Sequence, residues 1–228
     1  MKTSPRSSVL IDLAAIRHNV AHLLTLLSPG SRMLVAVKAD GYGHGTLPVA
    51  RAVVAAGAHG VAVATAEEAV ALRDAGFRSS ILVMGPLYSF DQYEEMARQC
   101  VDFAVVSDHM AAVLLGLRGS GLPARVHLKI DSGMNRQGLF PAQVDSFLES
   151  IKDIREIDLV GVMTHFACAT EDPTTIDFQL GRFLPAVERV RREWPNAVAH
   201  AANSAATVYA AHSHLDMVRC GCAVYGLS

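Results

Sequence analysis

The chain of 228 residues has little of several features that mark special classes of protein. Four cysteines are too few for the disulfide framework of a small secreted domain. There is no basic excess, because 20 Lys and Arg residues stand against 22 Asp and Glu residues, and this disfavours nucleic-acid binding. No apolar run has the length of a signal peptide or of the ~20-residue membrane span. The sequence therefore predicts a soluble, cytoplasmic protein without nucleic-acid or membrane partners.

Only two of the cysteines, Cys220 and Cys222, lie close together, and no second pair follows at zinc-finger spacing. We therefore predict no metal site. Side chains alternate along a strand, so if Arg219 and Gly221 face one side, the two cysteines should face the helix layer and pack in the core.

Apolar residues are abundant, at 51% of the chain, and charged residues make up only 18%. The mean hydropathy of +0.27 agrees with a substantial buried core and excludes intrinsic disorder. No linker or change in composition divides the chain, so residues 1–228 are predicted to form one domain.

Short Val, Leu and Ile runs recur along the chain with helical patterns between them, as in parallel strands covered on both faces. The runs span residues 33–38, 60–65, 80–85, 103–107, 125–131, 159–166, 198–203 and 217–225. Thr65 and Glu68 suit a capping box at one helix start, and Asp12 suits the cap of a helix that precedes the first strand. Eight such units predict a TIM-type (β/α)8 barrel entered with a helix, in preference to an open, doubly wound eight-stranded sheet.

In such a barrel, functional residues gather where strands end. Lys38 follows the apolar run of the first strand, where a buried charge is costly unless it is paired, neutralised or covalently used. A lysine that extends its amine to solvent at a strand end is the simpler alternative. The segment that follows contains Tyr42 and three alternating glycines at positions 41, 43 and 45, which leave room for a ligand to approach the backbone.

The loops after the last two strands are the usual phosphate site of this barrel class. Ser204 offers a hydroxyl, unless it is only a helix N-cap, and Gly221 lets backbone N–H groups face an anion. A lysine opposite a phosphate site suggests pyridoxal 5'-phosphate held as a Schiff base, with Arg219 at the pyridine nitrogen.

The segment 37–45, Val-Lys-Ala-Asp-Gly-Tyr-Gly-His-Gly, resembles the cofactor-lysine signature of bacterial alanine racemases. The similarity continues through residues 129–138, 164–166, 203–204, the Arg219-x-Gly221 pair and residues 225–228, and so covers essentially the whole chain in order. It implies a pyridoxal-phosphate-dependent isomerase that interconverts L- and D-alanine and supplies D-alanine for peptidoglycan.

The resemblance also assigns roles to individual residues. Lys38 would carry the cofactor and act as one base, Arg136 would bind the cofactor's phenolic oxygen and the substrate carboxylate, and His165 would adjust the pKa of a catalytic tyrosine. Arg219 would contact the pyridine nitrogen. The further residues implied in cofactor binding are Tyr42, Asn203, Ser204, Gly221, Cys222 and Tyr225, and Met134 is implied in substrate binding.

The sequence allows two interpretations of Lys129. In relatives, a lysine at this position can be carbamylated, which would turn a cation beside Arg136 into an anion. The alternative is an ordinary ion pair with Asp131 or another carboxylate.

The catalytic tyrosine of alanine racemases comes from a C-terminal β domain across a dimer interface, and none of the five tyrosines here matches it. We therefore expect residues 1–228 to form the barrel domain alone, as a monomer or weak dimer, with weak or no racemisation of alanine. A pyridoxal-phosphate-binding carrier barrel without turnover is the alternative function, and an aldolase or decarboxylase is a third.

Overall fold

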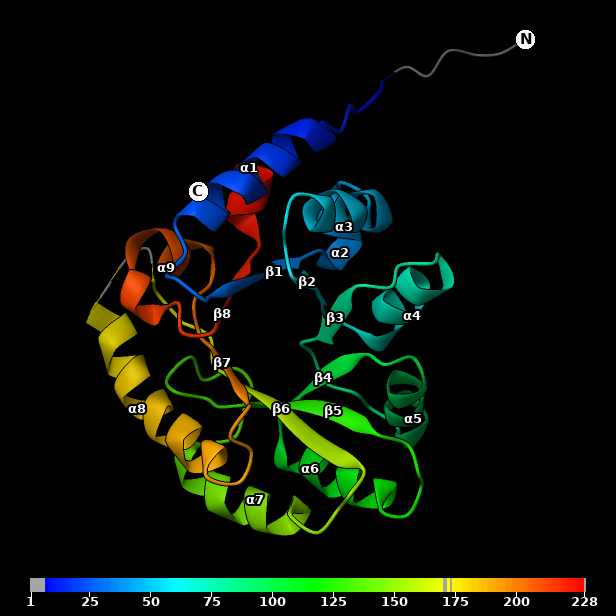
Figure 1. The fold of residues 1–228 in the computed structure, drawn as a ribbon, viewed down its shortest axis with the longest axis vertical. Coiled ribbons are helices and arrows are strands. Elements are labelled where there is room, and N and C mark those ends of the chain that lie inside the picture. The colour runs from blue at the N-terminus through cyan, green and yellow to red at the C-terminus, as the bar shows by residue number, and fades with distance from the viewer. Residues whose placement is uncertain (1–6, 170–171, 173, 228) are drawn as a thin grey trace.

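The computed structural model describes residues 7–169, 172 and 174–227, so Ser228, the last residue of the family resemblance, lies outside it. Eight parallel strands close into a barrel, because β1 pairs with both β2 and β8 (Figure 1). This confirms the predicted barrel and excludes the open sheet. The strands are β1 (Arg32–Ala36), β2 (Gly60–Val63), β3 (Ser80–Val83), β4 (Asp102–Val105), β5 (Ala124–Lys129), β6 (Ile157–Met163), β7 (Val198–His200) and β8 (Met217–Cys220).

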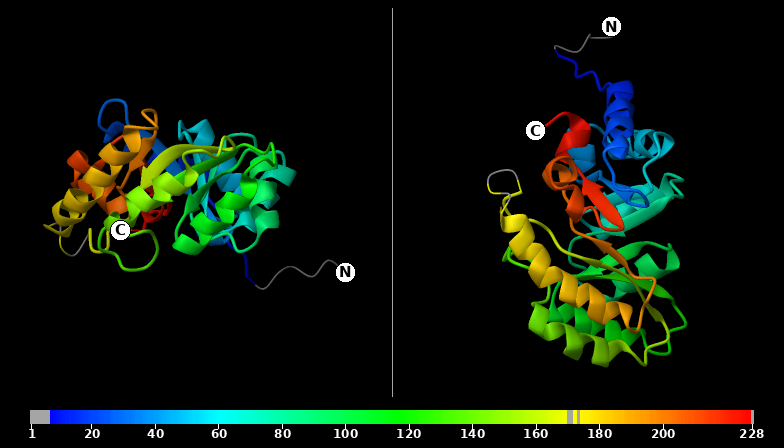
Figure 2. Two further views of the ribbon diagram at one scale, coloured as in Figure 1. Left: turned by 90° about the horizontal axis from the view of Figure 1, so that it is seen from below. Right: turned by 60° about the vertical axis from the view of Figure 1, so that its left-hand side comes forward.

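Helices surround the barrel, and Figure 2 shows them on its outside from two further directions. They are α1 (Leu13–Thr25), α3 (Thr46–Ala55), α4 (Ala66–Asp74), α5 (Phe90–Arg98), α6 (Asp108–Leu114), α7 (Val144–Ile151), α8 (Thr174–Arg191) and α9 (Ser204–Tyr209). A short segment, α2 (Lys38–Gly43), follows β1, and four 3-10 turns are η1 (Leu115–Leu117), η2 (Pro141–Gln143), η3 (Ala211–Ser213) and η4 (Cys222–Tyr225).

The first helix precedes the first strand, as predicted. Its N-cap is Asp12, whose carboxylate accepts hydrogen bonds from the N–H groups of Ala14 and Ala15. Its apolar stripe is buried, and Asn19 on the same helix donates a hydrogen bond of 3.0 Å to the carbonyl of Val224 in η4. The two ends of the described chain therefore pack together, as the blue and red elements of Figure 1 show.

Several strands end earlier than the apolar runs suggested. β1 stops at Ala36, so Lys38 opens the next segment instead of lying in the strand, and β7 stops at His200. β8 stops at Cys220, where the chain turns into η4, so strand alternation does not extend to Cys222. Cys220 is buried, as predicted, but Cys222 is exposed and the prediction of core packing was wrong for it.

No helix in the described part of the chain combines the length and the apolar character needed to cross a membrane.

Candidate active site

Lys38 begins a segment of unusual backbone. Ala39, Asp40, Gly41 and Tyr42 have φ angles of 51°, 52°, 61° and 54°, which makes α2 one left-handed turn. Left-handed helical geometry costs a residue other than glycine about 1–2 kcal/mol, because Cβ crowds the following carbonyl. The glycines at 41, 43 and 45, which the sequence suggested leave room for a ligand, also have positive φ angles that this turn needs. Such strain persists only where the surroundings impose it, and it concentrates at functional sites.

Two carboxylates hold this turn. Glu68 accepts the N–H of Ala39 at 2.7 Å through one oxygen and the N–H of Ala64 at 2.7 Å through the other. Glu68 also completes the predicted capping box of α4 with Thr65. Asp40 accepts the N–H of Thr46 at 2.9 Å, which ties the end of the turn to the start of α3. The backbone that carries Lys38 is therefore fixed from both sides.

The predicted phosphate site lies between α9 and η4. The N-cap of α9 is Asn203, whose side chain accepts from Ala206 N–H, so Ser204 is the first helical residue and not the cap. The Ser204 hydroxyl instead accepts the N–H groups of Gly221 at 2.9 Å and Ala223 at 3.3 Å. Two backbone N–H groups and a hydroxyl thus lie close together, which is the composition of an anion site; both N–H groups are bonded to the Ser204 oxygen here, so an anion would have to replace it as their acceptor.

Tyr42 borders the same point. A Cβ atom on Gly221 would lie 2.7 Å from the Tyr42 hydroxyl oxygen, so only glycine at 221 lets the tyrosine approach. The ring of Tyr42 lies 4.8 Å from that of Tyr225, and the Tyr225 hydroxyl donates to the carbonyl of Ala36 at 2.9 Å. The Lys38 amine lies 6.0 Å from the centre of the Tyr42 ring. Lys38 and the predicted phosphate site are therefore at the same end of the barrel.

Arg219 is buried inside the barrel on β8. Its Nη1 atom lies 2.9 Å from His200 Nδ1 and donates to the His200 carbonyl, and its Nη2 atom donates to the carbonyls of Thr164 and Ala201. Its buried Nε atom has no hydrogen-bond partner among the described residues. Burial lowers the pKa of Arg219 to about 10, so the guanidinium is charged at neutral pH. One N–H of a buried cation is thus left for an acceptor from elsewhere.

His165 is surrounded by positive charge. Burial, followed by the charges of Arg219, Lys129, Arg136 and Lys38, lowers the pKa of His165 to about 2. The ring is therefore neutral, and its Nδ1 atom lies 3.4 Å from Arg219 Nη2. A site with this many cations is suited to anionic ligands.

Lys129 is also buried at this end of the barrel. Burial, and then the charges of Arg219 and Arg136, lower the pKa of Lys129 to about 7. Among the described residues Lys129 makes no ion pair within 4 Å, so the alternative of a paired lysine is not observed. One oxygen of Asp131, Oδ1, accepts from the N–H groups of Gly133 and Asn135 and so shapes the loop after β5. This loop carries a half-buried Met134 and an exposed Arg136.

Two site residues were missed in the sequence. Glu68 was recognised as a helix cap, but its bond to Ala39 depends on a contact between residues 29 positions apart. His200 was passed over inside the seventh apolar run, although it is fully buried and bonded to Arg219. A polar residue within an apolar strand was the available signal for His200.

The comparisons with known proteins agree on one family. Residues 11–228 match the family model described as "Alanine racemase, N-terminal domain". A relative from Nostoc sp. named alanine racemase is 36% identical over 98% of this chain, and one from Symbiobacterium thermophilum is 39% identical over 95%. The chain spans only 59% and 58% of the lengths of these two relatives.

Solved structures give the same result. An alanine racemase from Bacillus anthracis with bound L-Ala-P is similar with a TM-score of 0.88 and 34% identity, over 96% of this chain and 57% of that one. One from Corynebacterium glutamicum has a TM-score of 0.87 at 33% identity, over 96% of this chain and 62% of that one.

Proposed function

This chain belongs to the alanine racemase N-terminal domain family, and from that premise we propose that its barrel binds pyridoxal 5'-phosphate and takes part in the interconversion of L- and D-alanine. A cytoplasmic location and a role in supplying D-alanine for the cell wall belong to the same proposal. The observation that carries it is the buried Nε–H of Arg219, which has no partner among the described residues and lies in the barrel that also presents Lys38 and the Ser204–Gly221 site.

The residues present fit this cofactor. A buried N–H donor matches a pyridine nitrogen, and the hydroxyls and backbone N–H groups near Ser204, Gly221 and Tyr42 match a phosphate. Asn203 holds the start of α9, and Tyr225 packs against Tyr42, so both support this site. When bound, pyridoxal phosphate supplies an electron-withdrawing ring that acidifies the Cα–H of an amino acid joined to it. The fixed charge of Arg219 disfavours a proton on the ring nitrogen, which moderates that effect.

Lys38 would hold the cofactor and, once displaced by the substrate amine, would accept the Cα proton of alanine at Nζ. The turn that carries it is fixed by Glu68 and Asp40, so the amine returns to one position after each exchange. Arg136 would bind the substrate carboxylate through its planar guanidinium, beside Met134. His165 is neutral and contacts Arg219, and it would orient a neighbouring acid or base group without carrying charge.

A second acid or base is needed on the other face of the substrate. Burial raises the pKa of Tyr42, and burial also raises the pKa of Tyr225, whose hydroxyl is bonded to the Ala36 carbonyl. Neither phenol is therefore suited to exchange protons near neutral pH. We propose that a tyrosine from outside the described residues supplies this group, and that residues 1–228 by themselves racemise alanine weakly or not at all.

We also propose carbamylation of Lys129. Its lowered pKa leaves a large neutral fraction at pH 7, which is the form that reacts with CO2, and the product would be an anion beside Arg136. Binding of alanine should then strengthen with added bicarbonate in the natural protein and not in Lys129→Met. Equal binding with and without bicarbonate contradicts this part of the proposal.

The experiment that tests the function is an absorption spectrum of the chain with pyridoxal phosphate. We expect a shifted, protein-bound band in the natural protein and its loss in Lys38→Ala, with Lys152→Ala as the control on an exposed lysine. A natural protein without the band contradicts the proposal. Addition of alanine distinguishes a racemase site from the alternative of a cofactor carrier, because only the racemase site should show a further change in the spectrum.

A further inference from the structure

A chain of hydrogen bonds crosses the barrel interior from its opposite end to Arg219. Asp102 Oδ2, at the start of β4, lies 3.4 Å from His127 Nε2. His127 Nδ1 lies 2.8 Å from His200 Nε2, and His200 Nδ1 lies 2.9 Å from Arg219 Nη1. His127, His200 and Arg219 are 4%, 0% and 4% exposed, so water does not substitute for these contacts.

Elementary hydrogen-bond chemistry fixes every proton in this chain. Arginine only donates, so His200 Nδ1 must accept and its proton lies on Nε2. His127 Nδ1 must then accept from His200, so the proton of His127 also lies on Nε2 and is donated to the carboxylate. Both rings are neutral Nε2–H tautomers, and all three donors point from the cation toward the anion. Burial, followed by the charge of Arg219, lowers the pKa of His200, in agreement with a neutral ring.

The backbone is built around the His127 ring. A Cβ atom at Gly161, the partner of His127 across β5 and β6, would lie 2.1 Å from Nδ1 of the ring. The register between these strands also shifts between Val126 and His127. The rings of His127 and His200 are perpendicular, with centres 5.0 Å apart, which directs the edge of one at the other. Glycine at position 161 therefore leaves the space that the His127 ring occupies in this series of hydrogen bonds.

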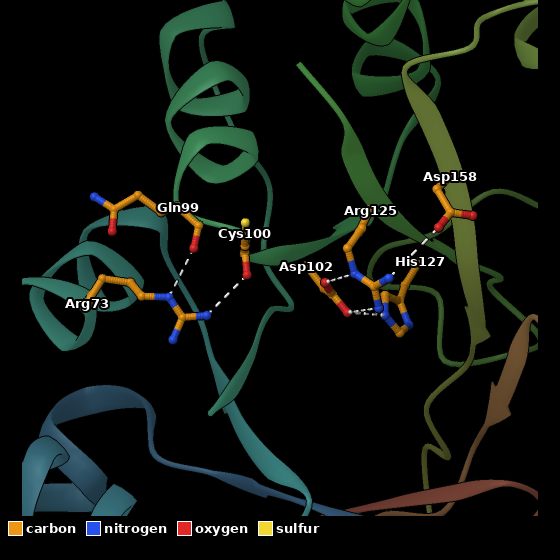
Figure 3. A network of polar contacts seen from close by, with 7 residues as sticks. All are labelled: Arg73, Gln99, Cys100, Asp102, Arg125, His127 and Asp158. Carbon is orange, nitrogen blue, oxygen red and sulfur yellow. Dashed lines mark hydrogen bonds and ion pairs between the residues drawn. The ribbon is translucent and has the colours of Figure 1, made fainter. Parts of the chain in front are cut away.

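The far end of the chain is anchored near the amino ends of the strands. Figure 3 shows His127 and Arg125 both reaching Asp102: Arg125 Nε donates to Oδ1 at 2.8 Å and Nη2 donates to Oδ2 at 3.4 Å, and Oδ2 also accepts from His127. Burial raises the pKa of Asp102, but its bonds and charge interactions with His127 and Arg125 outweigh this and lower it overall. Asp102 is therefore an anion at neutral pH, and with His127 it lines a cavity of about 70 Å³.

At Arg219, these hydrogen bonds determine which guanidinium N–H group is left without a partner among the described residues. His200 and the carbonyls of His200, Thr164 and Ala201 occupy the two terminal nitrogens of the guanidinium. Rotation of the group would break these bonds, so Nε stays the donor without a partner among the described residues. We propose that Asp102, His127 and His200 are positioning residues that fix the Arg219 guanidinium so that its Nε–H is presented to the ring nitrogen of the cofactor. This inference rests on the proposed function for the identity of the acceptor.

The first test needs no cofactor. Nuclear magnetic resonance of the chain labelled with ¹⁵N in histidine and arginine should report Nε2–H tautomers for His127 and His200 at pH 7. A charged ring or an Nδ1–H tautomer at either position overturns the proposal. This readout does not depend on pyridoxal phosphate. It therefore distinguishes a wrong assignment of the hydrogen bonds from a wrong proposal of function.

Variants of His127 test whether the series of hydrogen bonds fixes the position of the Arg219 guanidinium. His127→Leu removes both bonds of the ring, whereas His127→Gln keeps one acceptor and one donor and should restore the chain in part. We expect His127→Leu to shift the Arg219 Nε resonance and weaken pyridoxal phosphate binding about tenfold, as outer-shell changes do at metal sites, and His127→Gln to recover most of both. Leu and Gln variants that behave alike overturn the proposal.

Gly161→Ala provides a second perturbation that removes no polar group. It should displace the His127 ring, with the same shift of the Arg219 Nε resonance as His127→Leu. Asp158→Asn is the matched control, because this exposed carboxylate contacts Arg125 at the same rim but not His127. An unchanged Arg219 resonance in a folded Gly161→Ala protein, or an equal shift in Asp158→Asn, contradicts the proposal.

Discussion

The two ends of the barrel use charge differently. At the carboxyl ends of the strands, Lys38, Lys129, Arg136 and Arg219 form no ion pair within 4 Å among the described residues, and the backbone after Lys38 is strained. At the amino ends, Figure 3 shows charges with partners: Asp102 binds Arg125 and His127, and Arg73 donates to the carbonyls of Gln99 and Cys100.

This difference suggests that the carboxyl ends of the strands are arranged to bind ligands and the amino ends to stabilise the fold. Unpaired buried cations reduce the stability of a protein unless an anionic ligand or another modification compensates them. The ion pairs of Asp102 offset part of this cost, and Arg73, whose guanidinium is bonded to four carbonyls as that of Arg219 is to three, links the segments that precede β3 and β4.

Lys129→Met should stabilise the chain near pH 7. Because the pKa of Lys129 falls from 10.5 to about 7 on folding, the unfolded chain binds more protons between these values. The stability of the natural protein therefore rises with pH over this window, and the advantage of the variant, on the order of 4 kcal/mol at and below pH 7, should vanish by pH 10.5. Urea unfolding in CO2-free buffer measures it, and a difference independent of pH contradicts the assignment.

Arg73→Ala should destabilise the opposite end. Arg73 is buried and donates to the carbonyls of Phe77, Ser79, Gln99 and Cys100, so its loss should lower the free energy of unfolding by about 3 kcal/mol. The cofactor spectrum of the folded variant should not change. Arg136→Ala is the matched variant at the mouth, where we expect almost no change in stability but weaker binding of alanine. Equal losses of stability would remove the contrast between the two ends.

Glu68→Ala should release the turn that carries Lys38. The variant loses the acceptor for Ala39, Ala64 and Thr65 N–H groups, at a cost of about 2 kcal/mol. Amide hydrogen exchange at Ala39 should become faster. Thr65→Ala breaks the same capping box without touching Ala39, so similar exchange rates at Ala39 in both variants would show that Glu68 does not hold the turn.

Arg125→Gln should have the smallest effect. Its side chain is half exposed, and the pair with Asp102 should contribute about 0.5 kcal/mol, less at high salt. Arg98→Gln removes a comparable exposed pair on α5 and sets the background. A large loss confined to Arg125→Gln would mean that it orients Asp102 toward His127 and so belongs to the chain that reaches Arg219.

Much of the architecture was predictable because its signals are local. Apolar runs and capping residues such as Asp12 and Thr65 marked eight strands and the helices between them, and both caps are observed. The ends of β1, β7 and β8 were placed too late, because apolar composition does not record where a chain leaves its neighbouring strand. Residues such as Cys222 changed from buried to exposed for this reason.

Local sequence patterns were enough to predict the barrel, the family and the residue types at the ends of the strands, since periodicity and short motifs are properties of neighbouring residues. Tertiary structure alone decided that Lys38 sits on a left-handed turn, that Ser204 is an acceptor for Gly221 instead of a cap, and that Arg219 keeps one donor. It also brought His127 to His200, 73 positions away. Contacts over such separations exist only after the barrel closes, and no local pattern in the chain encodes their geometry.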